Sequence, residues 1–256
     1  MLTNLPRLSI AVLGSGPRAL ASAICLARHH RVKLGETFSE SSQRRVARIP
    51  VYPGEPDLNE LAHRAAANIE FVDTYSRALP MADLVVVAEQ PLYRTAQRSF
   101  DMSAIEQCLD AVARYRPRAT VVLEAPTPVG YARSAGLRHR IHVIPAPLLM
   151  RQGCIAGDRS QPQRILVGDV SETGLSYAFI AVRSCRDPGT PYLLVHSSEA
   201  EAIHAFERKR SLRGHSESHD EVTDFCQRHR LNENQVLKGL QTLDYVSESI
   251  HGELHA

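Results

Sequence analysis

The chain has 256 residues, of which 43% are hydrophobic and 23% are charged, and its formal net charge at neutral pH is only +2. Such an even balance gives no overall field that favours nucleic acid or an anionic membrane surface, so we expect neither as a partner. The longest apolar runs, such as residues 84–88, are far too short to span a bilayer, and no basic leader precedes the first predicted strand. We therefore expect a cytoplasmic protein that can bury one large core.

The first predicted elements are a strand, a glycine turn, a helix and a second strand within residues 8–36. In the turn, which reads GSGPRA, Gly14 permits a sharp bend, Gly16 lets a pyrophosphate approach the backbone, and Ala19 permits close packing of helix and strand. A carboxylate at the end of the second strand can bind the ribose and repel a 2′-phosphate. This pattern predicts a Rossmann fold that binds NAD rather than NADP, with these cofactor-binding residues: Gly14, Gly16, Pro17, Arg18, Ala19 and Glu36. The alternative is a glycine turn kept only for packing.

Short β-branched runs then alternate with helical patterns as far as residue 198. The predicted strands lie at 31–36, 69–72, 83–88, 119–124, 141–145, 164–168 and 192–196, and the clearest predicted crossover helix covers residues 101–117. This alternation is typical of an α/β fold, here a Rossmann-like doubly wound parallel sheet. Three helical stretches follow, so we divide the chain into a Rossmann domain at 1–198 and a helical segment at 199–256.

Six motifs occur in a recognisable order along the chain. In order, residues 49–61, 124–130, 147–153, 161–168, 199–206 and 230–240 read IPVYPGEPDLNEL, EAPTPVG, PLLMRQG, QPQRILVG, EAEAIHAF and RLNENQVLKGL. The first resembles the loop and helix after the second strand of the UDP-glucose/GDP-mannose dehydrogenase family. The other five resemble that family's STVPxG, PEFLREG, NPxRIxVG, AELxKxF and GLNxxxVxxGV motifs. Each motif is weak alone, but six in sequence indicate common ancestry.

The resemblance implies an NAD-dependent chemistry, because members of the family oxidise the C6 alcohol of a nucleotide sugar to a carboxylate in two hydride transfers to NAD. The second transfer needs a cysteine thiolate, found in a GGxCxPKD motif well beyond the central helix. None of the five cysteines in this sequence has such neighbours. We expect the chain to lack both this nucleophile and the C-terminal domain that holds much of the nucleotide.

Other catalytic positions of the family are also replaced. The positions of its threonine, its two glutamates, and its helix lysine and asparagine are held here by Pro126, Leu148, Gln152, His204 and Arg208. Leucine and glutamine cannot act as a general base. The VPTP loop of the family has become AEQP at residues 88–91, and Arg151 alone remains of the residues placed near the substrate. The catalytic set is therefore predicted to be degenerate.

Two pairs of residues that include histidine could still carry chemistry. His204 and Arg208 share a helix face and could form a new acid/base pair, although we favour two polar residues on an exposed face. His215 and His219 stand at the i, i+4 spacing of metal ligands, but no third ligand is evident, so we expect no metal site.

Two classes of function remain open from the sequence. The first is a non-catalytic NAD-binding or scaffolding protein in polysaccharide biosynthesis, with a nucleotide sugar or a full-length dehydrogenase as partner. The second is a small NAD-dependent oxidoreductase of altered chemistry that acts on a sugar or another alcohol. In the resembled family the central helix packs against its twofold mate, and Ala202, Ile203 and Phe206 keep an apolar spacing here. We therefore expect a homodimer through residues 199–230.

Overall fold

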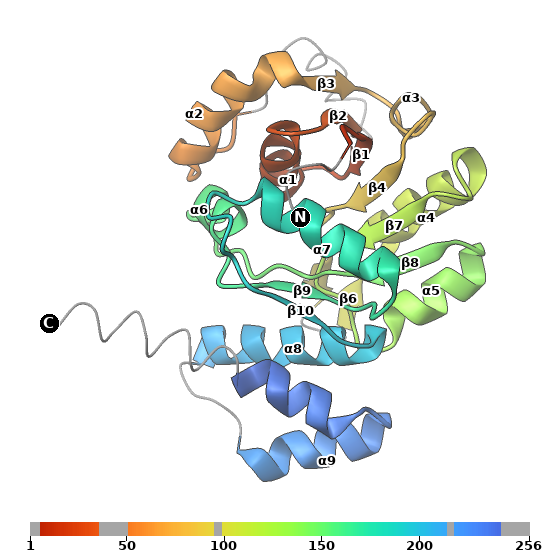
Figure 1. Ribbon diagram of the computed structural model, residues 1–256, viewed down its shortest axis with the longest axis vertical. Helices are drawn as coiled ribbons and strands as arrows, with labels where there is room; N and C mark the ends of the chain where they lie inside the picture. Colours follow the sequence, from red (N-terminus) through yellow and green to blue (C-terminus); the bar gives the residue numbers. More distant parts are fainter. Residues whose placement is uncertain (1–5, 36–50, 95–98, 214–217, 242–256) are drawn as a thin grey trace, which may run out of the picture.

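The computed structural model describes residues 6–35, 51–94, 99–213 and 218–241. Its centre is a six-stranded parallel sheet in the order β3-β2-β1-β4-β7-β8 (Figure 1). The strands are β1 (Ser9–Leu13), β2 (Arg31–Gly35), β3 (Ile69–Val72), β4 (Leu84–Val87), β7 (Thr120–Leu123) and β8 (His142–Pro145). The order reverses between β1 and β4, as in doubly wound dinucleotide-binding sheets. This confirms the predicted fold class.

Helices cover both faces of this sheet, which explains why its strands are almost continuously apolar. One face packs on α1 (Pro17–Ala27), α2 (Pro56–Ala65), α6 (Ile155–Ser160) and α7 (Glu172–Ser184). The other face packs on α3 (Tyr75–Ala78), α4 (Ser103–Tyr115) and α5 (Tyr131–His139). A 3₁₀ turn, Ala66–Asn68, joins α2 to β3. Ten of the eleven residues of α1 are buried, so this helix is enclosed rather than amphipathic.

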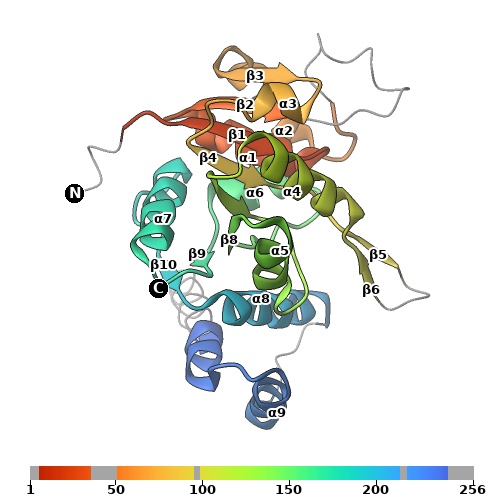
Figure 2. The ribbon, with the colours of Figure 1, turned by 90° about the vertical axis from the view of Figure 1, so that its right-hand side faces the viewer.

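Two small sheets lie outside the main one. β9 (Ile165–Val167) and β10 (Tyr192–Leu194) form a parallel pair, at two of the predicted strands. β5 (Leu92–Arg94) and β6 (Ser99–Asp101) form an antiparallel ribbon that projects from the body of the molecule (Figure 2). The sequence analysis missed this ribbon because strands of three residues carry too little periodicity.

The C-terminal helices form a third packing unit below β9 and β10 (Figure 1). It contains α8 (Ser197–Arg213), α9 (His219–His229) and the helical residues 233–241. The three apolar side chains assigned to a twofold mate, Ala202, Ile203 and Phe206, are buried inside the chain in a cluster that also holds Val222 and Val236. The homodimer and the domain boundary at residue 198 stay predictions. No described helix is both long and apolar enough to cross a membrane.

Candidate functional site

The glycine turn joins β1 to α1 at the point where the strand order reverses. The backbone angle φ is 143° at Gly14 and 104° at Gly16, values that L side chains rarely adopt. A Cβ atom at Gly14 would lie 3.0 Å from the backbone nitrogen of Glu89, whereas a Cβ at Gly16 would meet nothing within 4 Å. Pro17 is the first helical residue, where its missing N–H is no loss. The turn therefore packs tightly at Gly14 and is open beside Gly16.

A carboxylate already faces this turn. Glu89 accepts a hydrogen bond from the Ser15 amide at 2.7 Å, and the Ser15 hydroxyl lies 3.2 Å from each of its two carboxylate oxygens. Glu89 is buried, with 8% of its surface exposed. Backbone N–H groups before a helix attract anions, so this contact is favourable for the protein alone. The space beside Gly16 is open, but the Ser15 amide is occupied by a side chain that the sequence analysis did not single out.

The other predicted cofactor-binding residues do not share one environment. Arg18 is buried, and its guanidinium donates hydrogen bonds to the carbonyl oxygens of Leu148 at 2.7 Å and Met150 at 3.2 Å. It therefore joins α1 to the loop at 147–151 and does not point at the turn's outer surface. Ala19 is fully buried in the core, as expected for its packing role. Glu36 lies outside the described residues.

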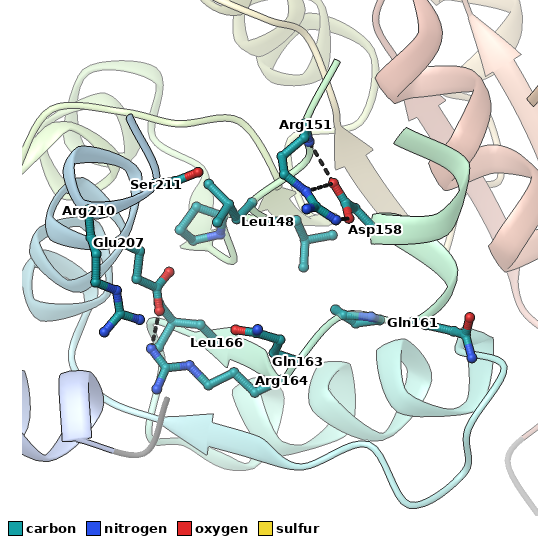
Figure 3. A pocket seen from close by; sticks show the side chains of 13 residues that line it. Leu148, Arg151, Asp158, Gln161, Gln163, Arg164, Leu166, Glu207, Arg210 and Ser211 are labelled. Carbon is teal, nitrogen blue, oxygen red and sulfur yellow. Dashed lines mark hydrogen bonds and ion pairs between the residues drawn. The ribbon is translucent and has the colours of Figure 1, made fainter. Parts of the chain in front are cut away.

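A pocket of about 350 Å³ is bordered by the 147–151 loop, by residues 161–166 and by the end of α8 (Figure 3). Arg151 pairs with Asp158, with 2.7 Å between the guanidinium and the carboxylate, and these two side chains lie opposite a second ion pair, Arg164 with Glu207. Arg210 also lines the pocket. The guanidinium groups of Arg151, Arg164 and Arg210 therefore border the pocket. The carboxylates of Asp158 and Glu207 offset part of their positive charge.

Of the positions that match the family's catalytic groups, only Leu148 lines this pocket, together with the retained Arg151. Pro126 is half-buried and Gln152 is exposed, and among the described residues neither belongs to the pocket lining. The structure therefore does not gather the replaced positions around one space.

The interpretation of His204 as an exposed side chain was wrong. Only 3% of its surface is exposed, and it lies beside Glu207, which is itself buried and pairs with Arg164. Its Nδ1 atom lies 3.8 Å from the Glu207 carboxylate. Arg208 is half-buried, with its guanidinium 4.6 Å from the centre of the Phe100 ring on β6. Each side chain has its own contact, Glu207 for His204 and Phe100 for Arg208, and the alternative acid/base pair stays a prediction.

The structure describes only one residue of the His215 and His219 pair, at which we expect no metal site. His215 lies outside the described residues, and His219 stands 3.9 Å from the carboxylate of Glu233. Within the ranges that the structure describes, no group of three or more histidine, cysteine or acidic residues could hold a metal ion.

A buried polar cluster links α1, α6 and α7 beneath the sheet. Glu124, at the end of β7, accepts hydrogen bonds from the Tyr177 hydroxyl at 2.9 Å and from Arg159 at 3.2 Å, and also from the Ser22 hydroxyl. The exposed fraction of the side chain is 0% for Arg159 and 1% for Glu124. The sequence analysis assigned neither residue a role, because the opposite charges are distant in sequence. This cluster therefore joins α1, which follows the glycine turn, to α6, which follows the 147–151 loop.

A second buried carboxylate connects α8 to the start of α5. Glu201 accepts hydrogen bonds from the Thr127 hydroxyl at 2.9 Å and from the backbone amides of Gly130 at 2.6 Å and Ala132 at 2.9 Å. Burial raises the pKa of Glu201 to about 6, although these hydrogen bonds act in the opposite direction. Glu201 therefore accepts hydrogen bonds from backbone amides at the start of α5, and the free-energy cost of burying its charge depends on pH.

This carboxyl gives a pH-dependent stability. Because its folded-state pKa lies above its ordinary value, the native protein binds more protons than the unfolded chain between about pH 4.5 and 6. Its contribution is fully present below this range and is lost as the pH rises through 6. We expect the free energy of unfolding of the natural chain, relative to Glu201→Gln, to fall by about 2 kcal/mol between acidic and neutral pH. Urea unfolding of both proteins across this range measures it, and a difference that does not change with pH would contradict it.

The fold and the turn together define a Rossmann-type α/β protein. No known family model matches the chain. It is 25% identical over 209 residues to a UDP-glucose 6-dehydrogenase of Streptococcus pneumoniae, covering 78% of this chain and 52% of that protein. It is 23% identical over 168 residues to the UDP-glucose 6-dehydrogenase of Campylobacter jejuni, covering 65% of this chain and 42% of that protein.

The fold agrees with a solved structure of a UDP-glucose dehydrogenase from the archaeon Pyrobaculum islandicum. The TM-score is 0.66 at 21% identity, over 90% of this chain and 59% of that one. Sequence and fold thus relate this chain to the UDP-glucose/GDP-mannose dehydrogenases, which confirms the resemblance carried by the six motifs. The chain spans about half the length of the curated relatives it matches.

Proposed function

We propose that this protein binds NAD at the Gly14–Ala19 turn and acts as a non-catalytic binding or scaffolding protein in polysaccharide biosynthesis. The observation that carries this proposal is the geometry of Gly16, whose positive φ and open outer side leave space for a diphosphate at the start of α1. The position of the turn, at the reversal of strand order, is where ligands bind in doubly wound sheets. The relatedness to UDP-glucose 6-dehydrogenases supports the choice of NAD.

The loss of catalysis is proposed from replacements within the chain. Pro126 and Leu148 offer neither a hydroxyl donor nor a general base, and Gln152 cannot ionise. His204 is buried beside Glu207, so it is not placed to exchange a proton with a ligand in the pocket. These replacements remove the groups that the family's chemistry needs while leaving the turn intact.

A nucleotide sugar is the proposed second ligand, in the pocket behind the 147–151 loop. Its phosphates would meet guanidinium groups, which bind them by forked hydrogen bonds. Arg18 donates hydrogen bonds from the first turn of α1 to this loop, so the two proposed sites are joined through its guanidinium group. A full-length dehydrogenase remains the proposed protein partner.

Binding at the turn is tested with a matched pair of glycine variants. We expect Gly16→Ala to weaken NAD binding at least tenfold, because the added methyl group fills the space that the diphosphate needs. Gly54→Ala is the control, since Gly54 also has a positive φ of 89° and an open Cβ position but lies away from the turn. Calorimetric titration of the three proteins measures the affinities.

The same titrations include NADP and Glu36→Ala. We expect NAD to bind more tightly than NADP to the natural chain, and the Glu36 variant to lose this preference. Equal losses in the Gly16 and Gly54 variants would show that backbone strain, and not the diphosphate space, controls binding. No NAD binding to the natural chain at millimolar concentration would contradict the proposed cofactor.

A further inference from the structure

Glu89 stands where the two halves of the sheet meet. It is the second residue after β4. The residue between them, Ala88, donates a hydrogen bond from its amide to the carbonyl of Leu13, at the end of β1, at 2.9 Å. β1 and β4 are neighbours in the parallel sheet, so the chain after β4 emerges beside the glycine turn after β1. In doubly wound folds this reversal of strand order is the ligand-binding edge. Glu89 is therefore placed at that edge by the topology of the sheet.

The side chain of Glu89 makes the contacts that a phosphate group would make there. One carboxylate oxygen accepts from the Ser15 amide at 2.7 Å, and both lie 3.2 Å from the Ser15 hydroxyl. Although Ser15 itself is exposed, Glu89 keeps only 8% of its surface exposed. An ionised carboxylate in this position is an internal anion that faces the positive end of α1.

The backbone of Glu89 lies directly against the glycine turn. A Cβ at Gly14 would lie 3.0 Å from the backbone nitrogen of Glu89 and 3.2 Å from its Cα atom, so the turn and residue 89 are packed backbone to backbone. Rotation of the Glu89 side chain would move the carboxylate away from the turn while this backbone contact is kept. A dinucleotide that brings a diphosphate to this turn must displace the carboxylate or bind beside a like charge.

We propose that Glu89 is an affinity-determining residue that occupies the diphosphate position of the glycine turn and weakens dinucleotide binding until its side chain is displaced. This inference rests on the proposed function, because it concerns the same turn. It differs from a purely structural cap in one respect: removing the charge strengthens binding of ligands that carry a diphosphate and leaves other ligands unaffected.

The test compares Glu89→Gln with the natural chain and with Glu55→Gln. Glutamine keeps the size of the side chain and removes its charge. Glu55 is the matched control because it is also buried and accepts backbone amides, from Gly153 at 2.5 Å and Ile155 at 3.2 Å, but it lies away from the turn. We expect Glu89→Gln to bind NAD and ADP-ribose at least tenfold more tightly than the other two proteins. Adenosine, which has no diphosphate, should bind all three equally.

A second measurement separates this inference from the proposed cofactor. The melting temperature of each protein is recorded with and without inorganic pyrophosphate, and we expect the larger rise for Glu89→Gln. If pyrophosphate stabilises this variant selectively and NAD binds this variant but not the natural chain, the inference stands and the proposed function fails. If the natural chain binds NAD and Glu89→Gln binds it no more tightly, the inference is overturned and the proposed function stands. If neither ligand distinguishes the variants, the inference is also overturned.

Discussion

Replacing Arg159 by methionine is expected to lower the free energy of unfolding by about 3–5 kcal/mol. The variant keeps a long apolar side chain but leaves the carboxylate of Glu124 buried without its cation. That carboxylate is 1% exposed and would retain hydrogen bonds only from neutral hydroxyl groups, those of Ser22 and Tyr177. An uncompensated buried charge costs far more than the pair itself contributes. Urea unfolding followed by circular dichroism measures the loss.

Two further variants show whether the buried charge is the cause. Arg64→Met removes an arginine from an exposed ion pair with Glu60, whose side chains are 71% and 64% exposed, and should change stability by less than about 1 kcal/mol. The double variant Arg159→Met with Glu124→Gln removes both charges and should be more stable than Arg159→Met alone. A double variant no more stable than the single one would show that lost packing, and not charge, explains the effect.

No formation of NADH is expected when the protein is incubated with NAD and a panel of UDP- and GDP-sugars. The five replaced positions, Pro126, Leu148, Gln152, His204 and Arg208, correspond to groups that act together in the resembled family. The loss of one such group lowers turnover by several orders of magnitude, and further losses add little. Turnover should therefore lie below detection even when the cofactor is bound. The absorbance of NADH measures it, with the Campylobacter jejuni UDP-glucose 6-dehydrogenase as the positive control.

The assay also decides between the two classes of function. Binding of NAD without turnover supports the non-catalytic protein. Sustained NADH formation that is lost in His204→Ala but kept in His142→Ala would establish an oxidoreductase of altered chemistry. His142 is a suitable control because its side chain is 53% exposed on β8 and lies 3.4 Å from Asp169.

The order of the elements could be predicted from the sequence because it depends on local patterns. Apolar runs such as residues 83–88 and the turn from Gly14 to Ala19 predict buried parallel strands and a strand-turn-helix unit without knowledge of any distant contact. The six motifs located the same units by their resemblance to a family. The ribbon of β5 and β6 escaped prediction, since its strands are short and lie outside the main sheet.

By itself, the sequence determined the class of fold and the position of the glycine turn, and it predicts which catalytic groups are replaced. Only the tertiary structure decided which charges are buried and what they contact. Glu89 lies 74 residues from Ser15, and Arg18 lies 130 residues from Leu148, yet each pair is joined by a hydrogen bond. His204 was expected on an exposed face, but it is buried beside Glu207, which forms an ion pair with Arg164, 43 residues away in the sequence. The environment of a polar side chain depends on the distant elements that cover it, and local periodicity carries no information about them.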